Sequence, residues 1–342
     1  MESSADISLR QFDRVVEEGY RRLFPGEPDK APDVLKWRFQ DNPHGRAKFA
    51  AAMEGDDLVG MIALVPTRLV NTAACSGYQG VDTAVEASQR GKGLFVKIGN
   101  AAQAQLGGDI LWGFPNANAA PGWYRRLGWT NFGTVPLLMR PLRLGFVLGR
   151  LHPRLRAFHI RLVRKRKCEV VVFSDGDRLA CEFERLWQRV SAWFGIAVDR
   201  SGAWMRWRLY DKPGADYRCV GIRDDRGALA AFVATKIVDK HGARLLYVME
   251  AIAADGHQKD LWKLLQSELS RGAHGGAEAA LAWCPHFAPN RSAYRRAGFL
   301  PMPDRLRPIE IYFGARALRA EGQAAAAADA KWYVSFLDSD TN

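Results

Sequence analysis

The chain has 342 residues, about two average domains, and 48% of them are hydrophobic, enough for ordinary packed cores. It contains no long uncharged apolar run, and its polar, acidic start lacks the apolar stretch of a signal peptide, so we expect neither a transmembrane helix nor secretion. The five cysteines are scattered without a C-x-x-C pair, which argues against a disulfide framework or a zinc site. We therefore expect a cytoplasmic protein without a metal.

The first half of the chain alternates between helix and strand patterns. The apolar spacing predicts a helix at 31–39, strands at 58–66 and 80–85, a helix from residue 94, a strand at 109–115 and a short helix after residue 120.

Residues 89–95 read QRGKGLF and lie between an expected strand and an expected helix. Gly91 and Gly93 allow backbone N–H groups to turn toward one point, and Arg90 and Lys92 add positive charge. The start of the following helix supplies further unpaired N–H groups and the positive end of its dipole. A basic surface turn is the alternative interpretation, but this position favours a phosphate site.

Residues 140–167 contain ten Lys and Arg and no carboxylate, which accounts for most of the net charge of +12. Leucines, valine and phenylalanine are interleaved with the arginines. Such a segment suits an anionic membrane surface, a phosphorylated substrate or a nucleic acid, and a solvated linker is the simplest alternative.

An internal repeat has an offset of 170 residues. Trp37 and Arg38 in KWRFQDNP recur as Trp207 and Arg208 in RWRLYDKP, and YRRLGW recurs as YRRAGF. Two separate motifs at one offset predict two copies of one domain, joined by the basic segment.

The element order and motifs of the first copy resemble the GNAT acyltransferase superfamily. Its signature, R/Q-x-x-G-x-G/A between the fourth strand and the third helix, matches Arg90 and Gly93, with Phe95 replacing the usual small residue. A second family landmark, an asparagine-rich strand end followed by Y-x-x-x-G-F/W, matches Tyr124 and the residues that follow it. The resemblance implies an α+β fold of two tandem GNAT-like domains, each a mixed, mostly antiparallel twisted sheet flanked by helices.

The resemblance also implies that the chain transfers an acyl group, expected to be acetyl, from acyl-CoA to a primary amine. The cofactor-binding residues would be Arg90, Gly91, Lys92, Gly93, Leu94, Phe95 and Asn116.

Tyr124 would protonate the leaving thiolate, and a backbone N–H near residues 82–85 would stabilise the oxyanion. The family does not specify one base. Asp82 and Glu86 are the first candidates, because they share a face if the strand extends that far, and His44 is a further one.

The second copy has DGHQKD at 255–260, where the first has QRGKG, and two carboxylates there would repel a diphosphate. We therefore expect it to lack acyl-CoA. In the tail, Trp332, Val334 and Phe336 alternate and predict a final strand, after which Asp338 and Asp340 either approach a pocket or form a frayed terminus. The expected divisions are 1–142 (N-terminal GNAT domain), 143–167 (basic linker), 168–315 (degenerate GNAT-like domain) and 316–342 (Ala-rich linker and tail).

The expected acceptor is a small-molecule amine, such as an amino sugar of bacterial surface polysaccharide carried on an anionic nucleotide. Residues 140–167 could also place the protein at an anionic membrane, whereas nucleic acid is not expected as a partner. Two alternatives stay open: a FemAB-like aminoacyl transferase, and a non-catalytic membrane- or nucleic-acid-binding module on a GNAT fold. The intact QRGKGLF stretch argues against both.

Overall fold

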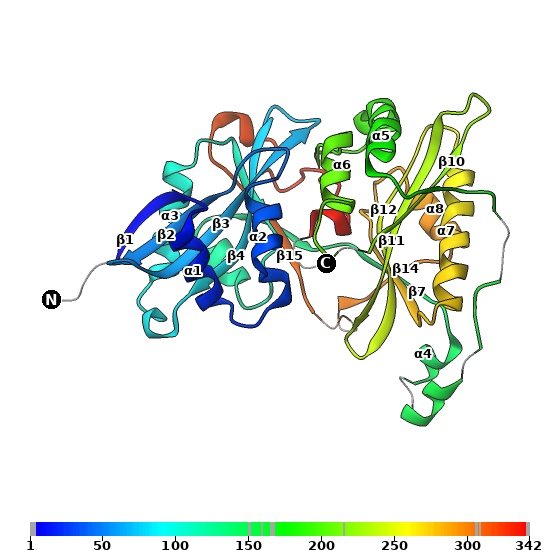
Figure 1. Ribbon diagram of the computed structural model, residues 1–342, viewed down its shortest axis with the longest axis horizontal. Helices are drawn as coiled ribbons and strands as arrows, with labels where there is room; N and C mark the ends of the chain where they lie inside the picture. Colours follow the sequence, from blue (N-terminus) through cyan, green and yellow to red (C-terminus); the bar gives the residue numbers. More distant parts are fainter. Residues whose placement is uncertain are drawn as a thin grey trace. The chain divides into compact units, whose positions relative to one another are not determined.

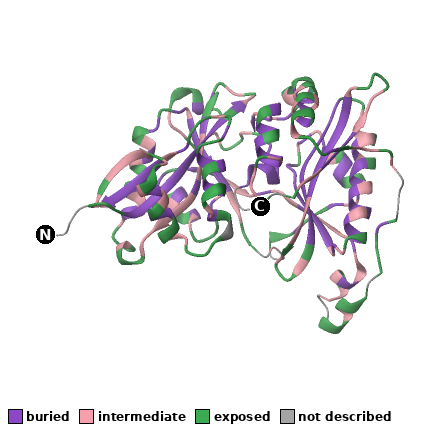
Figure 2. Cartoon of the chain, viewed as in Figure 1, coloured by how far each residue is buried: buried purple, intermediate pink, exposed green. Residues whose placement is uncertain are grey.

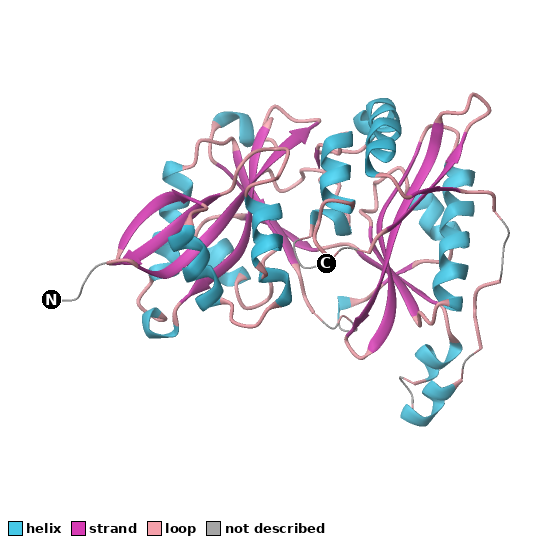
Figure 3. Cartoon of the chain, in the orientation of Figure 1, coloured by secondary structure: helices cyan, strands magenta, loops and turns pink. Residues whose placement is uncertain are grey.

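The computed structural model describes residues 5–149, 152–158, 160–164, 168–214, 216–304, 307 and 309–339. These residues form two compact units, each with its own sheet and helices (Figures 1 and 3). The first unit consists of Met1–Thr134, Asp211–Gly214 and Ile309–Lys331, and the second of Val135–Tyr210, Ala215–Pro308 and Trp332–Asn342.

The sheet of the first unit has the strand order β1-β2-β3-β4-β5-β15-β6. All neighbouring strands are antiparallel except the parallel pair β4 and β5. The strands are β1 (Asp6–Gln11), β2 (Lys48–Glu54), β3 (Asp57–Val70), β4 (Ser76–Val85), β5 (Ile110–Gly113), β6 (Thr130–Thr134) and β15 (Tyr312–Ala317).

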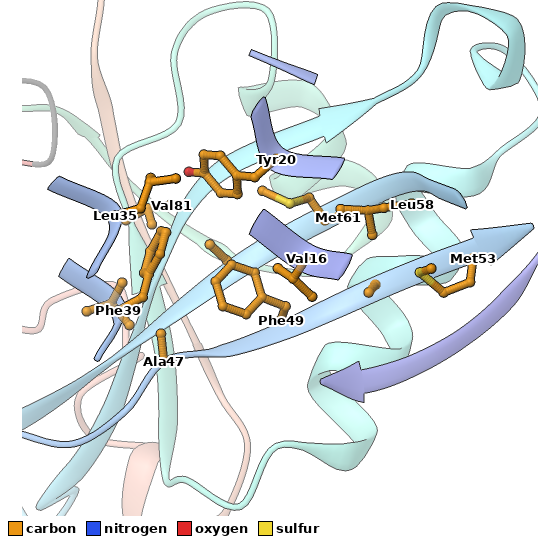
Figure 4. Close-up of a cluster of buried hydrophobic side chains, with 13 residues drawn as sticks. Val16, Tyr20, Leu35, Phe39, Ala47, Phe49, Met53, Leu58, Met61 and Val81 are labelled. Carbon is orange, nitrogen blue, oxygen red and sulfur yellow. The ribbon is translucent and has the colours of Figure 1, made fainter. Parts of the chain in front are cut away.

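Helices cover both faces of this sheet. On one face, α1 (Arg14–Leu23) and α2 (Pro32–Phe39) bury side chains such as Tyr20 and Phe39 against β2, β3 and β4 (Figure 4). On the other face, α3 (Leu94–Gln105) packs with the short helical turn η3 (Gly122–Arg126). Successive residues of β2 point to opposite faces, so that Ala50 joins the α3 core and Ala51 joins the α1 and α2 core.

The sheet of the second unit has the order β14-β7-β13-β12-β11-β10-β8, and again only one pair, β12 and β13, is parallel. Its central strands are buried (Figure 2). The strands are β7 (Leu137–Pro141), β8 (Val171–Phe173), β10 (Arg218–Arg223), β11 (Leu229–Lys240), β12 (Ala243–Ala253), β13 (Ala279–Trp283) and β14 (Leu300–Pro301). The short strand β9 (Ala197–Val198) is not part of this sheet. The helices are α4 (Leu144–Leu148), α5 (Gly176–Val190), α6 (Gly202–Leu209), α7 (Gln258–His274) and α8 (Arg291–Arg296).

Each sheet receives one strand from the other half of the chain. β15 follows the elements of the second unit but lies between β5 and β6 of the first sheet. β7 follows β6 but lies between β13 and β14 of the second sheet. The expected division after residue 142 assigns β7 to the first domain, and the one after residue 315 falls inside β15, whereas the compact units place β7 in the second unit and β15 in the first. The reason is that a strand belongs to the sheet of its partners and not to its place in the chain.

The fold class expected from the sequence, α+β with two mixed and mostly antiparallel sheets, is confirmed. The local predictions are confirmed too: α2, β3, β4, α3, β5 and η3 lie where the apolar patterns placed them. The expected final strand is wrong, because residues Phe336–Asp338 form a buried 3₁₀ turn, η8. Arg150 and residues 165–167 of the expected basic linker, and Asp340, lie outside the described residues.

Candidate functional site

The parallel pair β4 and β5 separates partway along its length. Its ladder runs from Gly77 opposite Ile110 to Gly80 opposite Gly113. The two strands approach closely there, since a Cβ on Gly113 would lie 2.8 Å from the carbonyl oxygen of Gly80. β5 then ends, whereas β4 continues to Val85. Residues 81–85 of β4 therefore have no strand partner on this side within the described chain, and this edge can offer backbone hydrogen bonds to a ligand.

The open edge of β4 contains a bulge at Asp82. The register with β3 shifts there, and Asp82 has a φ of 45°, which a non-glycine residue rarely adopts. Its Oδ1 accepts from Lys30 Nζ at 2.6 Å and its Oδ2 from Arg38 Nη1 at 2.9 Å, and the Tyr20 hydroxyl also donates to Oδ2. These contacts link the bulge to α1, to α2 and to the segment before α2.

The Asp82 carboxylate is a poor base in this environment. Its side chain is 9% exposed, and those of Lys30 and Arg38 are each 6% exposed. Burial alone would raise the pKa of Asp82, but the charges of Arg38 and Lys30 lower it below its ordinary value. This environment does not favour Asp82 as the base that abstracts the proton of the amine, which stays an untested prediction; the contacts favour an anchor that holds the β4 bulge.

The QRGKGLF stretch turns from β4 into the start of α3. Gly91 and Gly93 have φ values of 79° and 76°, and the space where a Cβ of either would lie is open. Gly93 is the N-cap of α3 and has no side chain to satisfy the first N–H groups of this 12-residue helix. Arg90 donates to the Val85 carbonyl at 3.2 Å and Lys92 to Gln89 at 3.3 Å, and both are exposed. N–H groups and cations thus meet at the end of the open edge, as a phosphate requires.

Phe95 fits at the start of α3 because Gly122, which lies next to its ring, has no side chain. A Cβ on Gly122 would lie 2.6 Å from the Phe95 ring, and the ring meets Trp123 edge-on at 5.4 Å between centroids. The large Phe95 ring therefore packs against η3 and fixes η3 to the start of α3.

Tyr124 lies on η3 with a buried hydroxyl that has no hydrogen-bond partner among the described residues. A Cβ on Gly314 of β15 would lie 2.6 Å from its ring and 3.1 Å from its hydroxyl, so the glycine makes room for the side chain. Burial raises the pKa of Tyr124, and nearby Tyr312 raises it further. The phenol is therefore protonated at neutral pH. A buried unpaired hydroxyl is costly, so the position favours a ligand as its partner.

Other predicted residues have local structural contacts. The Asn116 Oδ1 accepts from the backbone N–H groups of Asn118 at 3.1 Å and Ala119 at 3.0 Å, which turns the chain after β5. Glu86 directly follows β4, and its backbone N–H donates to Val59 at 2.9 Å. Its side chain is partly exposed.

His44 lies at the other end of β3. Its Nδ1 accepts from the Arg68 N–H at 3.1 Å, and Arg68 is paired with Ser76 at the start of β4. Burial lowers the pKa of His44 to about 4, with a further contribution from the charge of Arg68. The ring is therefore neutral at pH 7 and far along the strand from the open edge, which does not favour His44 as the base.

In the second unit, the tail of the chain fills the space where the parallel strands β12 and β13 separate. β12 pairs with β13 only as far as Val248 opposite Ala282 and then continues to Ala253. Phe336 stacks on Tyr247 of β12 at 4.7 Å and meets Trp283 of β13 at 4.8 Å. Side chains of the protein thus occupy the space between these two strands.

Buried ion pairs hold the tail in this place. Arg200 is fully buried and contacts Glu250 of β12 at 2.6 Å and Asp338 at 2.7 Å. The Tyr333 hydroxyl donates to Glu250 as well. Asp338 is thus neither a frayed residue nor a free acid near a pocket.

The turn before α7 is also unsuited to a diphosphate. Asp260 lies in the first turn of α7, 2.9 Å from His257 and 2.8 Å from Lys263. Tyr294, the counterpart of Tyr124 in the sequence repeat, is 1% exposed and packs against Phe299.

A cavity of about 340 Å³ in the second unit lies along β8, β10 and β11, away from β13. Arg218, Lys236 and Arg271 line it, and the buried Glu268 holds both arginines. It is therefore not the counterpart of the open edge in the first unit.

Within the described residues, no three His, Cys, Asp or Glu side chains are grouped closely enough to hold a metal ion. Among the helices of the described chain, none combines the length and the apolar character of a membrane span.

No family model matches the sequence, and no curated protein matches it either. Solved structures do match over both units. A GCN5-related N-acetyltransferase from Anabaena variabilis has a TM-score of 0.61 at 11% identity, covering 94% of this chain and 75% of its own. Saccharomyces cerevisiae N-myristoyltransferase with bound myristoyl-CoA has a TM-score of 0.60 at 11% identity, with coverages of 94% and 80%. The chain has the fold of the GNAT superfamily.

A third similar structure is a conserved protein of Enterococcus faecalis V583 described as a probable N-acyltransferase. Its TM-score is 0.59 at 13% identity, covering 92% of this chain and 73% of its own. Because these identities are low, the likeness is one of fold, and the chemistry has to be argued from the residues of this chain.

Proposed function

We propose that this chain is an acyl-CoA-dependent N-acyltransferase whose acyl-CoA site lies in the first unit. The observation that carries the proposal is the open edge of β4, which has the glycine turn at its end and the unpartnered Tyr124 hydroxyl in the same unit. The yeast protein of similar fold binds myristoyl-CoA. These residues fit an acyl-CoA, since N–H groups and cations suit its diphosphate and a buried donor suits its sulfur.

In the reaction, the amine attacks the thioester carbonyl carbon, the C–S bond breaks, and the electron pair leaves on sulfur. Backbone N–H groups along residues 81–85 would bind the carbonyl oxygen as its negative charge grows. The Asp82 anchor would keep this part of β4 in place. The acyl group passes from the sulfur of coenzyme A to the nitrogen of the amine, and no redox step is needed.

Tyr124 would donate to the departing thiolate. Its raised pKa keeps the proton on the phenol until sulfur needs it. A thiol has an ordinary pKa of about 8.5, so complete transfer from this phenol is uphill. The hydroxyl would therefore stabilise the thiolate by a hydrogen bond. As coenzyme A leaves, the phenol would pass its proton to sulfur, and the proton released by the amine would restore the phenol through water.

The amine must lose a proton, and Glu86 is now the better of the two carboxylate candidates. It follows the open edge of β4 directly, and no ion pair or hydrogen bond holds its side chain within the described structure. A water molecule between Glu86 and the amine would complete the transfer.

Acetyl-CoA as the donor, an amino sugar on an anionic nucleotide as the acceptor, and a cytoplasmic location belong to the same proposal. The support for an anionic acceptor is the net charge of +12. The turn with left-handed Gly91 and Gly93 supports acyl-CoA over an aminoacyl-tRNA donor.

Calorimetry with acetyl-CoA and with myristoyl-CoA tests the proposal. We expect one site per chain in the wild type, and at least a tenfold weaker Kd in Gly93→Asp, because a carboxylate there repels the diphosphate and strains the φ of 76°. Gly107→Asp is the matched control, since it adds the same charge at the far end of α3, in open space and without a positive φ. Two equivalent sites per chain, or equal affinity in both variants, would contradict the proposal.

A further inference from the structure

We infer that the basic hairpin, the described residues 142–149, 152–158 and 160–164, binds the surface of an anionic phospholipid membrane. The inference is independent of the proposed transferase activity. The hairpin belongs to the second unit, and in Figure 1 it extends away from the strands of that unit around α4.

The basic hairpin is a built structure. Its two arms pair through the backbone: Leu162 N–H donates to Leu142 at 2.8 Å, Leu144 N–H to Ile160 at 2.8 Å, and Gly145 N–H to Phe158 at 2.9 Å. A Cβ on Gly145 would lie 2.5 Å from the Phe158 oxygen, so the close approach of the arms requires a glycine. The pairing holds residues 160–162 alongside residues 142–144.

The second arm of the hairpin exposes an apolar face. Ile160 and Leu162 lie on either side of the antiparallel bridge between Arg143 and Arg161 and so share one face of the arm, and they are 58% and 39% exposed. Phe158, which accepts from Gly145, is 47% exposed. Val147 of α4 is 42% exposed. These four are half of the large apolar side chains exposed in the described chain, and the other four belong to separate segments: Val172, Trp193, Leu300 and Ile309. The concentration of exposed apolar residues in one hairpin marks an interaction surface.

Every charged side chain of the hairpin itself is positive. No Asp or Glu occurs from residue 140 to 168. Arg156 is paired with Glu278 at 3.0 Å, and it holds the hairpin to the second unit. Arg154, Arg161 and Arg164 are exposed, and no described carboxylate pairs with them. They remain available to anionic groups outside the protein.

Anionic lipid fits this combination better than other anions do. Cations bind the phosphate headgroups while aliphatic and aromatic side chains enter the headgroup and acyl boundary. A nucleic acid would match the arginines but would leave Ile160 and Leu162 without a partner, because base recognition uses hydrogen bonds and stacking. A membrane satisfies both halves of the surface.

Sedimentation of the full-length protein with vesicles tests the inference. We expect pelleting with vesicles of phosphatidylglycerol and phosphatidylcholine at 0.1 M salt, and at least a tenfold loss at 1 M salt or with phosphatidylcholine alone. The loss follows from the Debye length, which shortens from about 10 Å to about 3 Å over this range of salt.

Two variants separate the apolar and the charged contributions. Phe158→Ser with Ile160→Ser should weaken binding at least tenfold, whereas Val172→Ser with Leu300→Ser, a matched pair of exposed apolar residues outside the hairpin, should bind as the wild type does. Arg161→Gln with Arg164→Gln should weaken binding and make it less dependent on salt. Because this variant keeps the apolar face, it still tests the inference if the serine variant does not fold. Equal pelleting with both lipids, no pelleting with either, or wild-type binding by the glutamine variant would overturn the inference.

Discussion

Replacing Asp82 by Asn removes one negative charge from a buried site and changes little else. Asn has the same shape and tolerates the positive φ of 45° at this position. Lys30, at 2.6 Å, and Arg38, at 2.9 Å, then remain buried without the Asp82 carboxylate, and Lys30 keeps only the more exposed Asp29 at 3.2 Å as an ion-pair partner. Removing one partner of a buried ion pair costs about 3–5 kcal/mol, and the amide oxygen keeps one hydrogen bond, so we expect a loss of about 3 kcal/mol in the free energy of unfolding.

Urea unfolding at pH 7, followed by tryptophan fluorescence and circular dichroism, measures this loss. Glu86→Gln is the control, because it removes a carboxylate from a partly exposed site next to β4 and should change the free energy of unfolding by less than about 0.5 kcal/mol. A loss below about 1 kcal/mol in Asp82→Asn would refute the anchor. A normal stability together with a large fall in kcat would restore Asp82 as the base.

The pH dependence adds a second check on the anchor. The pKa of Asp82 is lowered in the folded state, so its stabilising contribution is present above the unfolded value of about 3.9 and is lost as the pH falls through the folded value. The difference between wild type and Asp82→Asn should therefore shrink below about pH 4. A difference that stays constant down to pH 2 would show that the cost arises from something other than ionisation.

Two further predictions concern Tyr124 and His44. Tyr124→Phe should lower kcat by about 10²–10⁴ and leave the acyl-CoA Kd and the stability nearly unchanged, as measured by steady-state kinetics, calorimetry and urea unfolding; wild-type turnover would assign the proton to water. Because the folded pKa of His44 is about 4 and its unfolded pKa about 6.5, its contribution is complete above pH 6.5 and is lost toward pH 4, by up to about 3 kcal/mol. His44→Gln should remove that slope from urea unfolding curves across this range, and parallel curves for the two proteins would contradict the assignment.

The features that follow from local sequence could be predicted. Gly91 and Gly93 lie between an apolar strand pattern and a helix pattern, and both take the left-handed backbone that glycine permits. The same reasoning located Tyr124 on a short helix after β5. Each of these predictions needed only a window of about ten residues.

The features that depend on distant partners could not be predicted. Lys30 precedes Asp82 by 52 residues and Arg38 precedes it by 44, and no spacing rule connects them. One signal was present: Arg38 and Arg208 recur in the sequence repeat, and both are buried, at 5% and 4% exposure. A buried arginine retained in two copies of a motif indicates a buried acceptor. The exchange of β7 and β15 has no local signal at all, since either strand could pair within its own half. The duplication itself stays a prediction.

The tail shows where the alternation rule fails. Alternation predicts a strand when one face of the segment meets solvent and the other meets the core. Residues 332–339 are buried on all sides, so the spacing of Trp332, Val334 and Phe336 carried no information about a solvent face. Instead, Ser335 and Asp338 form a capping box that starts the turn η8.

The two units differ in their suitability for acyl-CoA because different groups lie where their parallel strands separate, β4 from β5 in the first unit and β12 from β13 in the second. In the second unit, withdrawal of the tail would leave Arg200 and Glu250 buried without Asp338, and losing one partner of such a group costs about 3–5 kcal/mol. The withdrawal would also expose Phe336, which stacks on Tyr247, at a further cost of about 1.5–3 kcal/mol. The tail is therefore a permanent part of that core and not a lid that a ligand displaces. In the described part of the first unit, no strand pairs with residues 81–85 of β4 on the side of β5, and the Tyr124 hydroxyl is buried without a hydrogen-bond partner. An uncompensated polar group persists where a ligand completes it, which is the physical reason to look for acyl-CoA in the first unit alone.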